Sequence, residues 1–310
     1  MRLRIVVFCA ASAVLASTAG AGGFRKLPVS ARAVTLGGSL VALQDDPNVL
    51  FVNPAGIAAL TSISLSTSYT SLFTGISGDD LSYLSGSAVA NLGLIGNVGA
   101  GITAFRSNTW NEGQFVGTYA QQLFDIITVG GSAKVLYWSA AAPAGRLAVP
   151  EDALSKTTIS FDAGFQAKFA DIIPENDVII GAAVQDLTQP SIAHNGSPDG
   201  KLDLAATVGV AYVSRALEYI VLAQYQKAGD LNRIALGVEL VAARGSVIGQ
   251  NSSFTVRLGG STATQPVQQG DIFGGFGIEV AGLYFDYAFG QATRLQYVGG
   301  THHVTFRTTL

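Results

Sequence analysis

Charged side chains recur at alternate positions along much of the chain, and their chemistry is the first feature to explain. Nine of them lie opposite rows of apolar residues in alternating segments: Lys134, Asp162, Lys168, Arg233, Glu239, Arg257, Glu279, Asp286 and Arg307. Five are cations and four are anions. Because a pore that selects one sign of charge would show a ring of that sign, the near balance predicts a network of buried ion pairs.

Other residues that could do chemistry are few. The adjacent carboxylates Asp45 and Asp46 could pair with those cations or hold a calcium ion, and a helix cap with a salt bridge is the more common role of such a pair. None of the histidines, His194, His302 and His303, can be placed in a convincing triad with a serine nucleophile and an orienting partner. We expect no enzyme activity, no metal and no cofactor. The net charge of -3, without a basic patch, also argues against a nucleic-acid partner.

Composition favours a membrane protein. Only 13% of the residues are charged, whereas a typical soluble domain has about 25%. Arg2 and Arg4, an apolar stretch and Ala19-Gly20-Ala21 predict a signal peptide over 1–21. The single cysteine, Cys9, lies inside it, so we expect no disulfide or thiolate site in the mature chain. Beyond residue 22, no stretch approaches the ~18 apolar residues of a spanning helix.

The rest of the chain alternates with a period of two, which is typical of strands with one apolar face. In 158–169, for example, the odd positions are Ile, Phe, Ala, Phe, Ala and Phe, and the even ones are mostly polar. An even number of strands is expected for a closed bacterial barrel. The pattern predicts fourteen strands: 62–73, 80–91, 94–105, 114–122, 126–139, 156–170, 176–188, 202–214, 216–227, 231–244, 248–260, 271–280, 282–291 and 299–310.

The connections between these strands sort by length. Those after odd-numbered strands tend to be long and polar, such as 140–155 and 189–201, and those after even-numbered strands are mostly short. Outer-membrane barrels combine long extracellular loops with short periplasmic turns in this way. The alternative, a soluble β-sandwich, has no reason to sort its loops. We therefore predict an all-β fold, a 14-stranded antiparallel transmembrane β-barrel over 61–310.

Residues 22–60 do not alternate and predict a short helical hatch inside the barrel lumen. Asn53-Pro54-Ala55-Gly56 is typical of a helix start, with an Asn cap and Pro at the first helical position. Asp46-Pro47 can begin another helix. Short helices and Gly-Gly bends suit a compact plug better than a spanning strand.

This segment also carries a family resemblance. Arg-Ala-x-x-Leu-Gly-Gly at 32–38, Val-Ala-Leu-x-Asp-Asp at 41–46 and Asn-Pro-Ala-Gly at 53–56 resemble the N-terminal signature of the FadL-like outer-membrane transport superfamily. Within it the PorV/PorQ branch is the most similar. Gly181 to Leu187 resembles that branch's Gly-x-x-x-Gln-Asn-Leu strand, with Asp186 where Asn is usual, and Asp286-Tyr287-Ala288 resembles its Asp-Tyr-Ala strand.

The resemblance implies a 14-stranded barrel in the bacterial outer membrane with a hatch that includes the Asn-Pro-Ala element. FadL-type members pass long-chain fatty acids or aromatic hydrocarbons, which leave sideways through a kink in the third strand. Here Gly96, Gly99 and Gly101 could mark such a lateral opening or, alternatively, a close approach of the hatch to the wall. PorV/PorQ members include accessory proteins of type IX secretion, which hold exported cargo at the cell surface.

We therefore expect a plugged barrel that transports a hydrophobic small molecule. The alternative is an outer-membrane accessory or scaffold protein of a secretion system that transports nothing. The expected partners are outer-membrane lipid, a hydrophobic small molecule or a secreted cargo protein, and the barrel-assembly machinery for insertion.

Overall fold

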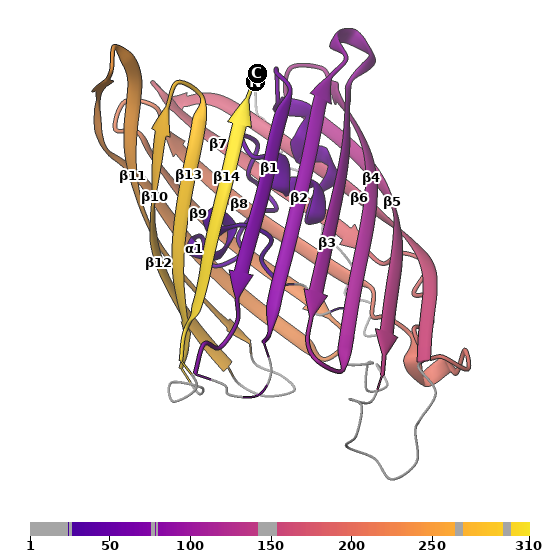
Figure 1. Ribbon diagram of the computed structural model, residues 1–310. Helices are drawn as coiled ribbons and strands as arrows, with labels where there is room; N and C mark the ends of the chain where they lie inside the picture. The colour runs from indigo at the N-terminus through magenta and orange to yellow at the C-terminus, as the bar shows by residue number, and fades with distance from the viewer. Residues whose placement is uncertain are drawn as a thin grey trace.

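The computed structural model shows a closed antiparallel barrel around a short N-terminal segment (Figure 1). It describes residues 24, 27–75, 78, 80–141, 154–263, 269–293 and 299–310, so the predicted signal peptide lies outside the described residues. The strands are β1 (Ser64–Ser71), β2 (Ser82–Asn91), β3 (Asn97–Arg106), β4 (Trp110–Leu123), β5 (Ile127–Ala140), β6 (Leu154–Ile173), β7 (Asn176–Gln185), β8 (Ala205–Ser214), β9 (Tyr219–Ala228), β10 (Leu231–Val247), β11 (Gln250–Ala263), β12 (Gln269–Val280), β13 (Leu283–Ala292) and β14 (Thr301–Thr309).

Each strand pairs with its neighbour in sequence, and β14 pairs with β1 to close the barrel. The closing register runs from Ser64 opposite Thr309 to Ser71 opposite His302. Closure pairs the backbone of both terminal strands, so the sheet has no free edge. The predicted 14-stranded antiparallel barrel is confirmed. The predicted strand ends differ from the observed ones by at most a few residues: the sequence pattern places the start of β4 at 114, and the strand begins at Trp110.

The two faces of the wall differ in the way that the alternation predicts. In β1, Ser66 and Ser68 face the lumen and are 7% and 4% exposed, whereas Leu65 and Tyr69 face outward and are 39% and 50% exposed. The other strands repeat this arrangement, with large apolar side chains exposed on the outside and polar ones buried inside. An apolar exterior around a polar interior is typical of barrels that stand in lipid.

The two rims of the barrel differ in their connections. At one rim, here called the loop rim, the connection between β7 and β8 spans 186–204 and folds back on the wall through Ile192 and Leu202. At the opposite rim, the turn rim, two residues suffice between β6 and β7, β10 and β11, and β12 and β13. The described connections therefore follow the predicted parity, although those after β3 and β9 are short. Most of the connection expected over 140–155 lies outside the described residues.

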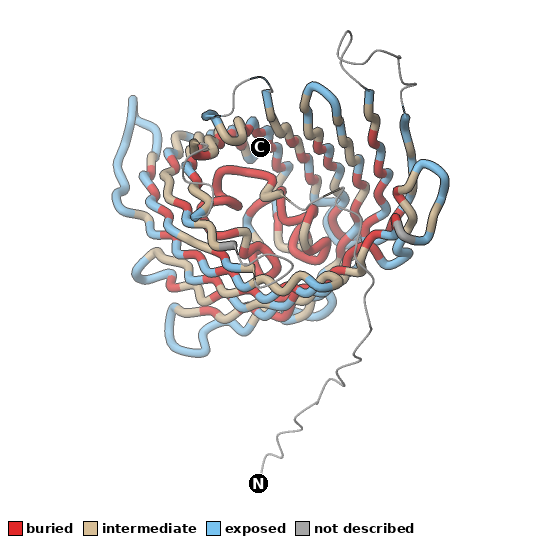
Figure 2. Tube along the Cα trace, turned by 90° about the horizontal axis from the view of Figure 1, so that it is seen from below, coloured by how far each residue is buried: buried red, intermediate tan, exposed pale blue. Residues whose placement is uncertain are grey.

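Residues 27–60, here called the hatch, lie inside the ring of strands (Figure 2). They form α1 (Ala31–Thr35), capped by Ser30, and the 3-10 helices η1 (Pro47–Phe51) and η2 (Pro54–Ala59). As expected, Asp46 and Asn53 are the N-cap residues that precede Pro47 and Pro54. Two further 3-10 turns lie in connections, η3 (Gly93–Ile95) and η4 (Pro198–Gly200).

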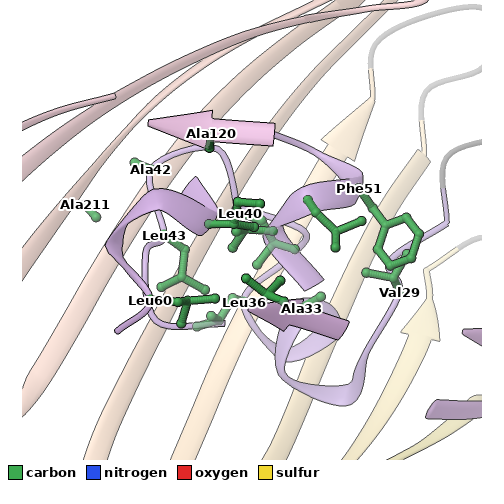
Figure 3. Packing of buried hydrophobic residues seen from close by; sticks show 14 of the residues in the cluster. Val29, Ala33, Leu36, Leu40, Ala42, Leu43, Phe51, Leu60, Ala120 and Ala211 are labelled. Atoms are coloured by element: carbon green, nitrogen blue, oxygen red, sulfur yellow. The ribbon is translucent and has the colours of Figure 1, made fainter. Parts of the chain in front are cut away.

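The largest buried apolar cluster also lies in the lumen (Figure 3). Leu36, Leu40, Leu43 and Leu50 of the hatch pack there against small wall residues such as Ala120. The buried apolar core of the barrel therefore lies where the hatch contacts the wall. No helix in the described part of the chain is long and apolar enough to span a bilayer.

Candidate functional site

Glycines on the lumen face of the wall form the seat of the hatch. Gly130 and Gly164 lie opposite each other on β5 and β6. A Cβ on Gly130 would come within 2.6 Å of the Pro54 carbonyl carbon, and a Cβ on Gly164 would overlap Asn53 Oδ1. The cross-strand pairs Gly181–Gly209 and Gly237–Gly259 receive hatch residues Val41 and Leu36 in the same way. Without side chains at these positions, the hatch backbone can lie directly on the wall.

Polar wall side chains hold the hatch backbone in this seat. Gln166 donates through Nε2 to the carbonyls of Val41 (3.0 Å) and Leu43 (2.9 Å). Gln185 donates to Phe51 O over 2.8 Å, and Asn97 donates to the carbonyls of Ile57 and Leu60. Such bonds satisfy backbone groups that the short helices leave unpaired. The hatch is therefore bonded to the wall on several sides.

The predicted hatch motif Asn53-Pro54-Ala55-Gly56 lies at the centre of this contact. Asn53 is fully buried, and its Nδ2 donates to Val41 O (2.7 Å) and to Phe165 O of β6 (3.1 Å). Its Oδ1 accepts the N–H of Ala55 over 3.1 Å. A Cβ on Gly56 would come within 2.8 Å of Val49 Cγ2 and 2.9 Å of Leu43 O, so glycine is needed for close packing. The motif joins three parts of the molecule and carries no reactive group.

A chain of charges, all buried except Asp45, crosses from the hatch to the wall on the opposite side of the lumen. Arg32 of α1 donates two hydrogen bonds to Glu239 (2.7 and 2.8 Å) and two to Asp45 (2.9 and 3.0 Å). Arg257 contacts Glu239 over 2.5 Å and Asp286 over 2.6 Å. Burial alone would lower the pKa of Arg32, but the attraction of Asp45 and Glu239 outweighs it, so that the pKa is raised well above its ordinary value. These bidentate pairs fix the orientation of α1.

Asp46 and Arg307 extend this network. Arg307 donates to Asp45 O over 2.8 Å, lies 3.9 Å from an Asp46 carboxylate oxygen and covers the ring of Tyr284. Asp46 also lies 3.6 Å from Arg32 and caps η1 through Asn48 N–H. The two adjacent aspartates thus act as a cap and as ion-pair partners, and no group of three or more metal-ligand side chains occurs among the described residues.

The remaining predicted lumen charges lie in separate places. Lys134 is bonded to Asp162 (2.8 Å) and Asp186 (2.7 Å), all three buried near the loop rim. Arg233 donates to Gly37 O and Ser261 Oγ. Two more lie at the turn rim: Lys168, 3.1 Å from Asp177, and Glu279, which accepts from Ser253. The nine charges therefore form several local groups rather than one ring.

The hatch separates two cavities. The one toward the turn rim has a volume of about 490 Å³ and is lined largely by polar and charged side chains, among them Arg32, Glu239, Arg257 and Arg307. The one toward the loop rim, here called the upper cavity, has a volume of about 90 Å³. Leucines and phenylalanines line much of the upper cavity, together with several amide side chains: Leu27, Leu40, Phe51, Phe105, Leu136, Leu202, Gln114, Gln185, Gln224 and Gln226.

The glycines of the third strand do not border a gap. Over its whole length, β3 pairs in continuous register with both β2 and β4. A Cβ on Gly101 would come within 2.5 Å of Phe51 Cζ, and one on Gly99 within 3.2 Å of Ile57 Cδ1. Gly96 lies in the β2–β3 turn with a φ of 104°. The structure therefore places Gly99 and Gly101 against the hatch, which was the alternative to a lateral opening.

The histidines lie apart from any nucleophile arrangement. His303 faces the lumen and contacts Thr70 Oγ1 through Nδ1 over 2.7 Å. His302 faces outward and contacts Tyr287 Oη over 2.8 Å. His194 lies in the β7–β8 connection beside Ser155 O. Each has a local structural partner, and the three lie in different surroundings.

Sequence reasoning missed two groups of residues that hold the hatch. Arg32 is the first residue of the Arg-Ala-x-x-Leu-Gly-Gly motif at 32–38, but only its position inside the barrel shows that it contacts Glu239. The wall glycines were visible as glycines on the polar face of alternating strands, and Gly164, between Asp162 and Gln166, is one example. Small residues at lumen positions are thus a signal for hatch contact.

Neither a family model nor a curated protein sequence matches the chain. Solved barrels do match it in structure. The toluene transporter TodX of Pseudomonas putida has a TM-score of 0.62 at 11% identity, over 92% of this chain and 99% of TodX. The toluene transporter TbuX of Ralstonia pickettii has a TM-score of 0.55 at 13% identity, over 91% of this chain and 98% of TbuX.

A FadL homologue from Pseudomonas aeruginosa is also similar, with a TM-score of 0.54 at 13% identity, over 91% of this chain and 95% of that one. At such identities the likeness concerns the fold alone, and that fold is FadL-like. None of these matches speaks for the PorV/PorQ branch.

Proposed function

We propose that the protein is an outer-membrane barrel that carries a hydrophobic small molecule, with the loop rim outside the cell and the turn rim in the periplasm. The observation that carries this proposal is the upper cavity, a partly apolar space between the hatch and the wall. Clefts lined by apolar side chains with a few polar groups are the usual form of small-molecule sites. The FadL-like fold, which two toluene transporters share, also supports transport of a hydrophobic molecule.

The size of the upper cavity limits the guest. Its volume is about 90 Å³, less than the roughly 150 Å³ of an engineered cavity that holds benzene. A ring-sized guest must therefore displace side chains that line the cavity. Leu202 belongs to the β7–β8 connection and is 8% exposed, so movement of this connection would enlarge the space.

The second candidate is an accessory protein of a secretion system, as in the PorV/PorQ branch. The continuous pairing of β3 favours it, because the wall there has no lateral exit for a hydrophobic guest. The many bonds between hatch and wall favour it as well, since a hatch that stays in place blocks the lumen. This role requires no guest in the upper cavity, and the two candidates therefore differ in one measurable property.

The test is uptake of labelled toluene and p-cresol by cells with an intact lipopolysaccharide layer. Cells that produce the protein should take up at least one compound faster than cells without it. Val52→Trp should abolish the gain, because Val52 lines the upper cavity and indole would fill it. Leu65→Trp, on the outward face of β1, is the matched control and should keep the gain. Equal uptake of both compounds by cells with and without the protein would reject transport and favour the accessory role.

A further inference from the structure

We infer that the upper cavity binds an uncharged hydrophobic molecule with one hydrogen-bonding oxygen, such as a phenol or an alkanol, rather than a plain hydrocarbon. This inference rests on the proposed transport function and names the substrate class of that same cavity. Three features carry it: partner-free polar groups on one wall, apolar side chains around them, and a balanced set of charges.

The polar groups lie on β8 and β9. Gln226 lines the upper cavity and is 8% exposed, and its amide has no hydrogen-bond partner among the described residues. Thr207 lies directly opposite Gln226 on β8, is 1% exposed, and its Oγ1 is also without a partner in the described part of the chain. Side chains in such cross-strand positions are close neighbours, with Cβ atoms about 5 Å apart.

A third group belongs to the same wall. Gln224 precedes Gln226 by two residues on the lumen face of β9 and also lines the cavity. Its Oε1 accepts the N–H of Val41 over 3.0 Å, and its amide nitrogen donates to no acceptor among the described residues. The amides of Gln224 and Gln226 therefore face the cavity with donor groups that are available to a guest. These amide donors suit a hydroxyl or carbonyl oxygen, and Thr207, which lies outside the cavity lining, can orient the neighbouring Gln226 amide.

The rest of the lining suits an apolar body. Leu40 and Phe51 of the hatch and Phe105, Leu136 and Leu202 of the wall line the same cavity. A set of water molecules would satisfy the amides but would leave these side chains wetted. A guest with an apolar body and a polar end satisfies both parts of the lining.

The charges of the cavity exclude an ionic guest. Its lining contains the anions Glu112 and Asp186 and the cations Lys134 and Arg233. Glu112 accepts from Phe24 N–H and Trp110 Nε1, Lys134 contacts Asp186 over 2.7 Å, and Arg233 donates to Gly37 O and Ser261 Oγ. The two anions and two cations cancel, so the lining has no net charge to repay a carboxylate or ammonium for the water that it loses.

Three probes that share a methyl-substituted ring separate these features: toluene, p-cresol and p-toluate. Binding to the protein in nanodiscs is measured by titration and corrected with empty nanodiscs. We expect p-cresol to bind roughly tenfold more tightly than toluene, the gain of one or two buried hydrogen bonds, and p-toluate to bind more weakly than p-cresol.

The variants Gln226→Leu and Thr207→Val should each reduce the preference for p-cresol over toluene, and either suffices if the other fails to fold. Gln122→Leu, at an exposed position outside the cavity lining, should keep the preference. Equal binding of toluene and p-cresol, or tightest binding of p-toluate, would overturn the substrate class while leaving transport in place. If none of the three probes binds, and cells with and without the protein take up the compounds equally fast, both the inference and the transport function are overturned.

Discussion

At the scale of residues, the charges of the lumen hold the hatch to the wall and do not form a ring that would select ions. Asp45, Arg32, Glu239, Arg257 and Asp286 follow one another in contact from the hatch to the wall of β13. The three middle members, Arg32, Glu239 and Arg257, each contact an opposite charge on both sides. Removing one member of a buried pair is costly chiefly because the other remains charged and without its partner.

Reversing one charge should therefore have a large effect. Arg257→Glu places a third carboxylate between Glu239 and Asp286, and we expect the free energy of unfolding to fall by about 3–5 kcal/mol. Urea unfolding in detergent and the heat-dependent shift in gel mobility measure this change. The matched control is Arg244→Glu, which breaks only the exposed pair with Glu218 and should cost about 0–1 kcal/mol. Similar losses in both variants would show that the buried network contributes nothing specific.

The alternation of the sequence predicted which charges face the lumen, because a period of two assigns each residue to a face. It could not predict their partners. Glu239 and Arg257 are opposite each other on β10 and β11, so their pairing follows once the register is known. The contact of Glu239 with Arg32 joins residues 207 apart, and it depends on where the hatch runs inside the barrel.

At the scale of elements, the strands were predictable and the path of the hatch was not. Each strand carries its own alternating signal, and its neighbours follow from chain order. The hatch carries local signals for its helix starts at Pro47 and Pro54, which the structure contains as 3-10 helices. Its position, however, is set by recesses in distant strands, such as the pair Gly130 and Gly164.

Filling one recess should dislodge the hatch without preventing insertion. In Gly164→Ala the new Cβ would overlap Asn53 Oδ1 and lie 2.9 Å from Pro54 Cδ, an overpacking of the kind that costs about 1–3 kcal/mol. We expect a folded barrel with raised ion conductance in planar bilayers. Gly117→Ala in β4, where a Cβ meets nothing within 4 Å, should conduct no more than the unaltered protein. Equal conductance of all three proteins would mean that the recess does not hold the hatch.

At the scale of the whole molecule, barrel and hatch have different sources of stability. The barrel satisfies its backbone through ladders between all neighbouring strands, which close between β14 and β1 and contain register shifts in the β6–β7 and β10–β11 pairs. The hatch depends on the wall, because its helices are short and its carbonyls accept bonds from wall side chains such as Gln166 and Asn97. Loss of the hatch should therefore leave the barrel standing, whereas the hatch alone would have no fold.

Deletion of Ser30 to Gly56 tests this division. The strands begin at Ser64, so every ladder bond that a spanning barrel needs remains available, and the variant should still insert and show heat-dependent gel mobility. The wall around the emptied lumen remains polar. Because glycines line the recesses, no wall side chains can fill the space that the hatch leaves. We expect steady ion conductance from this variant in planar bilayers and near silence from the unaltered protein. Large steady conductance from the unaltered protein would contradict a seated hatch, and failure of the variant to insert would show that the hatch supports the barrel.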